Sequence, residues 1–378
     1  MKLLVAGGGT GGHLFPGIAI AEELVGRGKG KDNSVIFVGT ERGIEKTEVP
    51  RMGYEVRFID VTGIKGKGFA GAIRGLLRLP RALIQSLRLL RLYRPDVVVG
   101  VGGYASGPVL LAAWLSGIPI ALQEPNAVPG FTNRVLGTIA AAAFTAFPEA
   151  GRHFPRHKVF LLGNPIRKSL RDNNFLTPAP PVEGRFSVLV FGGSQGAHAL
   201  NERMIEAVPL LPPALRKVIH VVHQTGTRDL AAARAAYARV DADVTVREFI
   251  EEMSPAYQQA DLVVSRAGAT TIAELTCCHK PAILIPLPTA ADDHQTKNAA
   301  ALVATGAAVA IPQAELTGAR LAAEITRLWQ DPAGRAAMAR AAGIRFRPQA
   351  AYEIVDVLVQ LAARRVSAAG ARRARRGV

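Results

Sequence analysis

The sequence of 378 residues contains only two cysteines, Cys277 and Cys278, which are adjacent in the chain. They cannot build a disulfide framework, and they lack the paired spacing of a structural zinc site. Acidic residues are also scarce, with 30 Asp and Glu against 46 Lys and Arg, so the net charge is +16. The apolar fraction of 49% excludes a wholly disordered chain. No signal-peptide pattern follows Met1, and we expect a protein of a reducing, cytosolic compartment.

The excess positive charge is concentrated in two segments. Residues 63–94 carry eight Lys and Arg, residues 364–376 carry six Arg, and neither segment contains an acidic residue. The rest of the chain is nearly balanced. A protein that grips nucleic acid along its length would spread its charge more evenly, so nucleic acid is not the expected partner.

The longest stretch without a charged residue covers 97–123, and its 27 residues are enough to span a bilayer. Glycine and proline interrupt it. A β-branched run at 97–101 leads through a turn to a short helical stretch, and a second apolar run follows at 118–122. This order predicts a strand, a helix and a parallel strand rather than a membrane span.

Short apolar runs alternate with helical stretches along most of the chain, which predicts an α/β protein with parallel sheets. One segment is repeated, because residues 4–13 align without gaps on residues 189–198 with six of ten positions identical. Each copy is a strand that leads through a glycine-rich turn into a helix. We predict two Rossmann-like domains, with ligands at the carboxyl ends of their strands.

Four segments follow from this pattern. We expect an N-terminal domain over 1–163, a proline-rich linker over 164–185, a C-terminal domain over 186–345, and a helix with an Arg-rich tail over 346–378.

The glycine-rich turns are candidate phosphate sites, because the helix behind each turn offers backbone N–H groups and a favourable dipole. Neither turn is followed by the Lys-Ser/Thr of a P-loop, and the acidic residue of a dinucleotide fingerprint is missing. A purely structural turn is the alternative. His13 and His198, which end the two turns, are likewise either functional residues or structural residues at a helix start.

A third candidate covers Ser265 to Glu274, after a predicted strand at 261–264. We expect Thr270 or Thr271 to cap the helix that starts there. Glu274 then lies one turn in, where its carboxylate either accepts from ribose hydroxyls or only complements the helix dipole. The polar residues 292–298 suit a hydroxyl-rich ligand or form a solvated loop. Asp241 and Asp243 read as a surface turn, and no metal site is predicted.

The basic segment 68–94 is amphipathic. At 100° per residue its arginines fall in one stripe and its leucines on the opposite face. Pro80 starts a second helix or kinks a single one. The segment either packs on the core with a solvated basic face or binds an anionic membrane surface. The residues of the membrane face would be Arg74, Arg78, Arg81 and Arg88.

Seven motifs occur in the order of one enzyme family. They are Gly8–His13 with Phe15–Gly17, Gly102–Tyr104, Gln123–Asn126, Gly163–Arg167, Gly192–Ala197, Ser265–Ala269 with Glu274, and Asp293–Gln295 with Asn298. The chain resembles the bacterial enzymes of glycosyltransferase family 28 that transfer N-acetylglucosamine (GlcNAc) from UDP-GlcNAc to lipid I, giving lipid II for peptidoglycan synthesis.

The resemblance implies a GT-B fold, with two Rossmann-like domains whose parallel sheets face a deep cleft. It implies inverting transfer to the 4-hydroxyl of the muramyl sugar of lipid I, which is linked to undecaprenyl diphosphate. The residues it places at UDP-GlcNAc are Thr10, Gly11, Gly12, Asn126, Arg167, Ser194, Gln195, Ile250, Ala269, Thr270, Thr271, Ile272, Ala273, Glu274 and Gln295. Gly103 and Tyr104 would lie on the acceptor side.

The catalytic base implied by this mechanism is His13, with Glu124 as the rival. The family usually reads His-Glu-Gln-Asn where this chain has Gln123-Glu124-Pro125-Asn126, which weakens any catalytic role for a side chain at 123 or 125. The resemblance also implies a peripheral enzyme on the cytoplasmic face of the plasma membrane, without a tightly bound cofactor. Dependence on a divalent cation and contacts with division proteins stay open.

Three alternatives remain at this point. Another GT-B enzyme would glycosylate a different lipid such as diacylglycerol, and a UDP-sugar epimerase would share the fold without needing a membrane face. An RNA-binding protein would use the basic segments, and it would bind RNA with a steep salt dependence.

Overall fold

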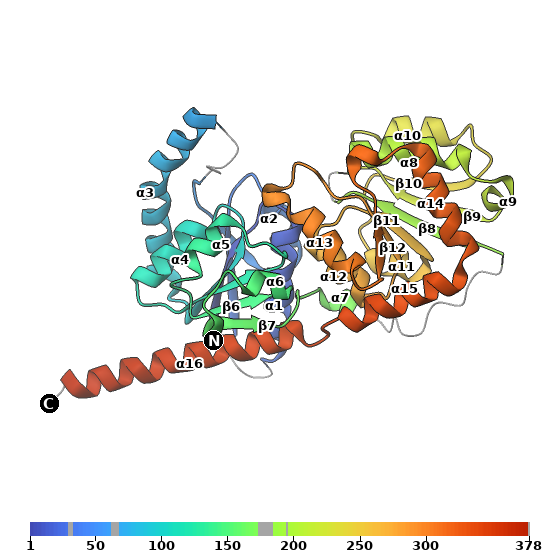
Figure 1. Ribbon diagram of the computed structural model, residues 1–378. Helices are drawn as coiled ribbons and strands as arrows, with labels where there is room; N and C mark the ends of the chain where they lie inside the picture. The colour runs from blue at the N-terminus through green and yellow to red at the C-terminus, as the bar shows by residue number, and fades with distance from the viewer. Residues whose placement is uncertain (29–32, 62–67, 173–183, 194–195, 377–378) are drawn as a thin grey trace. The chain divides into compact units, whose positions relative to one another are not determined.

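The computed structural model of the chain describes residues 1–28, 33–61, 68–172, 184–193 and 196–376 (Figure 1). It divides into two compact units. Met1–Lys168 and Gln349–Val378 form the first unit, and Ser169–Pro348 form the second. We expected residues 346–378 as a separate helix and tail, whereas their contacts assign nearly all of them to the first unit.

The first unit is built on a parallel sheet with the strand order β3-β2-β1-β4-β5-β6-β7. The central strands are runs of Val, Ile and Leu that are buried on both faces, as parallel strands covered by helices require. The strands are β1 (Lys2–Gly7), β2 (Ser34–Gly39), β3 (Glu55–Phe58), β4 (Val97–Gly102), β5 (Ile120–Glu124), β6 (Ala142–Thr145) and β7 (Val159–Leu161).

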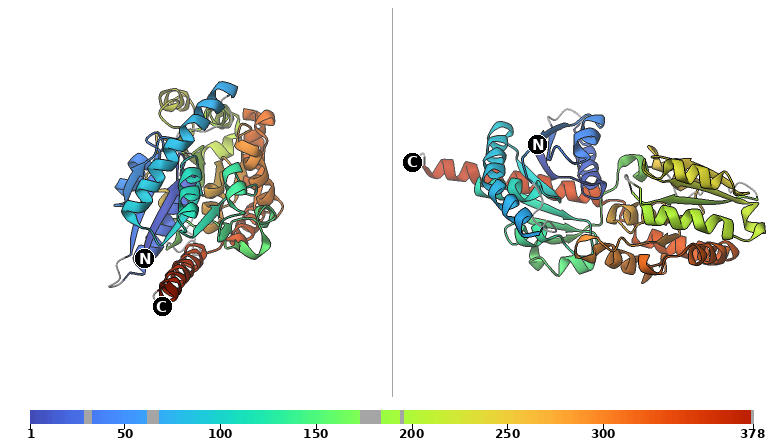
Figure 2. Two further views of the ribbon diagram at one scale, coloured as in Figure 1. Left: turned by 90° about the vertical axis from the view of Figure 1, so that its left-hand side faces the viewer. Right: turned by 90° about the horizontal axis from the view of Figure 1, so that it is seen from above.

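Helices cover both faces of this sheet (Figure 2). On one face, α1 (Gly11–Gly26), α2 (Glu45–Arg51) and α16 (Ala350–Arg376) pack on side chains such as Val5 and Val99. On the other face, α3 (Gly68–Tyr93), α4 (Ser106–Leu115) and α5 (Phe131–Leu136) pack on side chains such as Leu4 and Val98. The short helix α6 (Pro148–Gly151) also belongs to this unit, and α7 (Lys168–Arg171) begins at Lys168 and continues into the second unit.

Helix α16 is fastened to α1 through Arg27. The guanidinium lies 3.9 Å from the centre of the Tyr352 ring, and it donates to Asp356 Oδ1 at 2.5 Å and to the carbonyl of Tyr352 at 2.6 Å. Ile354, Val355 and Leu358 are buried in the core of the first unit. The chain therefore returns to its first unit after completing the second.

The uncharged run 97–123 folds as β4, α4 and β5, which confirms the predicted strand–helix–strand order. Pro80 lies inside the continuous helix α3, so it does not start a second helix. Within the described ranges, no helix combines the length and the apolar character needed to cross a membrane.

The second unit contains a second parallel sheet with the order β10-β9-β8-β11-β12-β13. Its strands are β8 (Phe186–Phe191), β9 (Ile219–Gln224), β10 (Asp243–Arg247), β11 (Leu262–Ser265), β12 (Ala282–Leu284) and β13 (Ala308–Ala310). Its helices are α8 (His198–Leu210), α9 (Pro213–Arg216), α10 (Leu230–Tyr237), α11 (Met253–Gln259), α12 (Ala269–Cys277), α13 (His294–Val303), α14 (Gly318–Gln330) and α15 (Pro332–Arg345). Helices α8, α10 and α14 pack on Val188 and Val190, and Tyr257 of α11 meets the ring of Phe191 on the other face.

Both sheets have a topological switch point. The chain passes from β1 to β2 on one side and later returns to β4 on the other side of β1, and β8, β9 and β11 repeat this arrangement. The two glycine-rich turns follow β1 and β8, and the loops after β4 and β11 lie beside them. Ligands of open parallel sheets bind at such points, so the predicted motifs stand where binding is expected.

Candidate functional site

The first glycine-rich turn is shaped by close backbone approach. Gly9 has a φ of +89°, and the Gly8 N–H donates to the carbonyl of Gly102 at 3.2 Å. A Cβ atom at Gly103 would lie 2.4 Å from the carbonyl oxygen of Gly8, so a side chain there would displace the turn. The glycines after β1 and β4 thus let two loops meet at the switch point.

A buried carboxylate that the sequence analysis missed holds the same turn. Glu45, the first residue of α2, is only 1% exposed. Its Oε2 accepts from the Gly9 N–H at 2.7 Å, and its Oε1 accepts from the Thr40 N–H at 2.8 Å. Glu45 therefore fixes the path of the turn that leads into α1.

Helix α1 begins at Gly11, with Thr10 in an extended conformation before it. His13 lies in the first helical turn, where its Nδ1 is 3.4 Å from Thr10 Oγ1. Its ring lies against Gly102, because a Cβ atom there would be 2.6 Å from His13 Cδ2. Thr10, Gly11, Gly12 and His13 therefore lie beside Gly103, and the exposed side chain of Tyr104 follows.

Glu124 ends β5 and is 1% exposed. Its Oε1 accepts from the backbone N–H of Asn126 at 3.0 Å and from Asn126 Nδ2 at 3.2 Å. Its Oε2 accepts from the Gly130 N–H at 3.1 Å and from Asn133 Nδ2 at 2.9 Å. Burial raises the pKa of Glu124, and these four donors oppose that shift. The carboxylate orients Asn126 and the loop that leads to α5.

Arg167 belongs to the first unit. Its Cζ lies 4.4 Å from the centre of the Phe15 ring, so the guanidinium stacks on α1. Nearby, Gln123 Nε2 donates to Asn164 Oδ1 at 3.3 Å, and both side chains are buried. Gln123, at the position where the family usually has histidine, is thus part of the interior.

The second glycine-rich turn follows β8. Ser194 and Gln195, both predicted to bind the donor, lie outside the described residues, but the glycines on either side are described. Gly193 and Gly196 have φ values of +103° and +75°, and a Cβ atom at Gly196 would lie 2.0 Å from the carbonyl oxygen of Thr225. This turn is therefore pressed against the end of β9.

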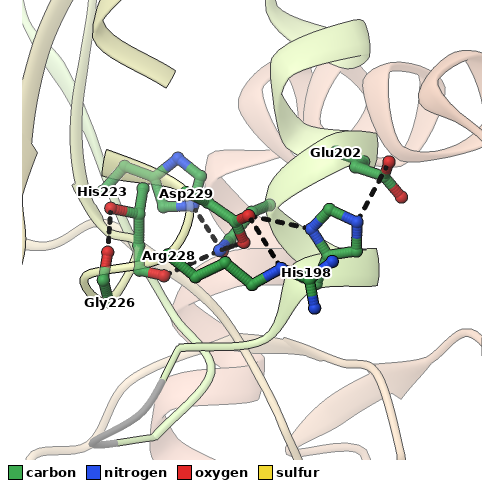
Figure 3. Close-up of polar contacts among 8 residues, drawn as sticks. His198, Glu202, His223, Gly226, Arg228 and Asp229 are labelled. Carbon is green, nitrogen blue, oxygen red and sulfur yellow. Dashed lines mark hydrogen bonds and ion pairs between the residues drawn. The ribbon is translucent and has the colours of Figure 1, made fainter. Parts of the chain in front are cut away.

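A chain of polar side chains lies behind this turn (Figure 3). Asp229 Oδ1 lies 2.9 Å from His198 Nδ1, and Asp229 Oδ2 accepts from Asn201 Nδ2 at 2.7 Å. Asn201 Oδ1 in turn lies 3.1 Å from Nε2 of His223, whose side chain is buried. His198, the first residue of α8, is therefore connected through Asp229 to Asn201 of the same helix and to the loop after β9, which supports the structural interpretation of this histidine.

Helix α12 begins at Ala269, with Gly268 in the N-cap position. The prediction that Thr270 or Thr271 caps this helix is wrong, because the extended backbone of Gly268 starts it earlier and both threonines lie in its first turn. Glu274 is 7% exposed, and its Oε2 accepts from the Tyr257 hydroxyl at 2.9 Å. Tyr257 of α11, which the sequence analysis missed, therefore positions Glu274.

The loop between β12 and α13 is tied to the same region. Gln295 Oε1 accepts from the Leu287 N–H at 3.0 Å, and the buried Asn298 donates from Nδ2 to the Ala267 carbonyl at 3.3 Å. Arg266 donates to the Ile285 carbonyl at 3.1 Å, and burial lowers its pKa. The predicted residues at 269–274 lie at the start of α12 and Gln295 lies at the start of α13, so they stand at the same edge of the sheet.

Asp243, one of the two aspartates in the expected surface turn, makes a local contact. Asp243 Oδ2 lies 2.7 Å from His220 Nδ1, as befits a structural residue at the start of β10. In the portion of the chain that the structure describes, no three His, Cys, Asp or Glu side chains are grouped to hold a metal ion.

Two parallel-sheet units, each with a glycine-rich turn at its switch point, define the GT-B fold class. The chain belongs to glycosyltransferase family 28, whose N-terminal domain model matches residues 3–145 and whose C-terminal domain model matches residues 187–354.

Individual relatives agree with this assignment. A protein of Anaeromyxobacter sp. (strain Fw109-5) is 59% identical over 97% of this chain and 94% of its own length. A protein of Myxococcus xanthus (strain DK1622) is 55% identical over 96% of this chain and 93% of its own. Both are named UDP-N-acetylglucosamine–N-acetylmuramyl-(pentapeptide) pyrophosphoryl-undecaprenol N-acetylglucosamine transferase. The crystal structure of Acinetobacter baumannii MurG has a TM-score of 0.75 and 32% identity, and the match covers 95% of this chain and 99% of that one.

Proposed function

We propose that this protein transfers GlcNAc from UDP-GlcNAc to lipid I, the undecaprenyl-diphosphate-linked muramyl pentapeptide, and so makes lipid II for peptidoglycan synthesis. The observation that carries the proposal is the near full-length similarity to transferases whose names state this reaction. The positions of the glycine-rich turns at both switch points support it. No tightly bound cofactor is part of the proposal.

The donor would bind mainly to the second unit. Its diphosphate would meet the glycine-rich turn at 192–196 and the start of α12, where a helix dipole favours negative charge. Glu274, held by Tyr257, would accept from the ribose hydroxyls, and the backbone at Ile250 would contact the uracil. Gln295 would reach the sugar. In the first unit, Asn126 would contact the sugar and Arg167 the nucleotide.

The transfer would be a single displacement with inversion. The 4-hydroxyl oxygen of the muramyl sugar attacks the anomeric carbon of GlcNAc, the bond from that carbon to the diphosphate oxygen breaks, and UDP leaves. His13 takes the hydroxyl proton. We favour His13 because both oxygens of Glu124 already accept hydrogen bonds from Asn126, Gly130 and Asn133. Glu124 would instead position Asn126.

The membrane-facing surface would be the helical layer α3–α4–α5. Large apolar side chains on these helices are exposed, among them Trp114 at 47%, Leu115 at 58% and Phe131 at 65%. Arg81 and Arg88 are exposed on α3 and add positive charge. Arg78 and Arg81 both pair with Asp60, at 3.2 Å and 3.9 Å. The side chain of Arg74 lies outside the described part of the structure. Apolar side chains with nearby arginines suit an anionic bilayer surface, so we expect a peripheral enzyme of the cytoplasmic membrane face.

The experiment that tests the proposal is UDP release from UDP-GlcNAc in the presence of a lipid I analogue, of diacylglycerol, or of no acceptor. Of these three conditions, we expect UDP release only in the presence of the lipid I analogue. Release that needs diacylglycerol would identify a different lipid glycosyltransferase, and UDP release without acceptor would identify a hydrolase. Conversion of UDP-GlcNAc into an epimeric UDP-sugar without UDP release would identify an epimerase.

A further inference from the structure

Gln224 is a buried side chain that the proposed reaction does not use directly. It is the last residue of β9, next to β8 in the centre of the second sheet, and it is 2% exposed. Its Nε2 donates to the carbonyl of Gly193 at 2.9 Å. Its Oε1 accepts from the backbone N–H of Ile250 at 2.8 Å. One amide group therefore joins two segments that are far apart in the sequence.

These two segments are the ones expected at opposite ends of the nucleotide. Gly193 belongs to the turn proposed for the diphosphate, and Ile250 to the backbone proposed for the uracil. The chain just after Gln224 reinforces the connection, because the N–H groups of Thr225 and Gly226 donate to the carbonyls of Arg247 and Glu248, each at 3.0 Å.

The amide of glutamine suits this place chemically. Gly193 presents an acceptor and Ile250 presents a donor, so the side chain between them must donate from one atom and accept at another. A carboxylate of the same length would lose the donor and set its charge against the Gly193 carbonyl. A methionine would fill the space but provide no strong hydrogen bond to either segment.

We propose that Gln224 is a positioning residue for the donor: it holds the diphosphate-binding turn in register with the backbone that receives the base. This inference rests on the proposed function, because it assumes that UDP lies across both segments. Because the spacing between the two segments is already set, less free energy is lost to ordering them when UDP binds. The side chain acts through Gly193 and Ile250, so it should govern donor affinity rather than the chemical step.

The test uses Gln224→Met and Gln224→Glu in the full chain. Methionine nearly conserves the volume, so this variant should fold even if the buried charge of Gln224→Glu prevents folding. Gln330→Glu, at the exposed end of α14, is the matched control for the added charge. Circular dichroism and urea unfolding check folding, calorimetry gives the Kd for UDP, and UDP release gives KM and kcat.

We expect both folded Gln224 variants to raise the Kd for UDP and the KM for UDP-GlcNAc about tenfold or more, because each leaves a buried polar group unpaired. The KM for the lipid I analogue and kcat at saturating donor should stay near the parent values. A merely structural role would lower the unfolding midpoint without this selective change in KM.

Two results overturn the inference: a folded Gln224→Met with the UDP affinity of the parent, or a loss confined to kcat. The proposed function fails separately. A parent chain that binds UDP but transfers no sugar contradicts the function alone, and the calorimetric comparison of the variants still tests Gln224.

Discussion

Lowering the pH should destabilise the second unit through one buried side chain, His223. Its Nδ1 lies 3.0 Å from the Tyr237 hydroxyl, and its Nε2 lies 3.1 Å from Asn201 Oδ1. The neutral tautomer with its proton on Nε2 satisfies both contacts, because Nδ1 then accepts from the hydroxyl. Burial lowers the pKa of His223 from 6.5 to about 4.

The sign and size of the effect follow from this shift. In the unfolded chain the imidazole binds a proton near pH 6.5, and in the folded chain only near pH 4. Between these values the unfolded state binds more protons, so the free energy of unfolding is fully retained above the window and falls as the pH drops through it. At about 1.4 kcal/mol per pH unit, the whole window corresponds to about 3 kcal/mol.

The assay is urea unfolding at a series of pH values, followed by the fluorescence of Trp329, which packs against the core of the second unit. Trp114 is the other tryptophan, so Trp114→Phe serves as the background. Comparison with His223→Gln on that background isolates the imidazole, because glutamine keeps a donor and an acceptor but does not titrate. The reasoning is refuted if both proteins lose the same stability between pH 6.5 and 4.

Three further predictions concern the first unit. His13→Ala should lower acceptor-dependent turnover by ~10²–10⁴-fold while the Kd for UDP is unchanged, and turnover near the parent level would exclude His13 as the base. The double variant Arg81→Glu with Arg88→Glu should bind anionic vesicles more weakly, because each basic residue contributes about 1 kcal/mol to that binding. Its affinity for UDP should be unchanged. Equal vesicle binding by parent and variant would show that α3 is not part of the membrane face. Glu45→Gln should cost about 1–3 kcal/mol in urea unfolding, because one amide cannot accept from both Gly9 and Thr40, and an unchanged midpoint would contradict this role.

Much of the fold could be predicted because its signals are local. Apolar runs of strand length with helical stretches between them mark each β-α unit, and the repeat at 4–13 and 189–198 marks the first strand of each sheet. The carboxyl ends of parallel strands share one edge, so the motifs after β1, β4, β8 and β11 were expected to gather there. The structure places those of these motifs that lie within the described residues at the two switch points.

The supporting residues could not be predicted, because their partners are distant in the chain. The carboxylate of Glu45 accepts from the Gly9 N–H, and the amide of Gln224 connects Gly193 to Ile250. No pattern of spacing in the sequence predicts either contact. The return of α16 to the first unit depends on Arg27, Tyr352 and Asp356, which no local periodicity connects. The prediction of a threonine N-cap for α12 was wrong for a different reason. The N-cap is Gly268, whose backbone is extended, so the helix begins earlier than the preference of threonine for this position suggested.

The central claim is the transfer of GlcNAc to lipid I, and product analysis tests it most directly. The protein is incubated with UDP-GlcNAc and a lipid I analogue, and the lipid product is identified by mass spectrometry and nuclear magnetic resonance. We predict one added N-acetylhexosamine, joined in β-linkage to the 4-hydroxyl of the muramyl sugar. An unmodified lipid together with an epimerised UDP-sugar, or an α-linked product, would contradict the account.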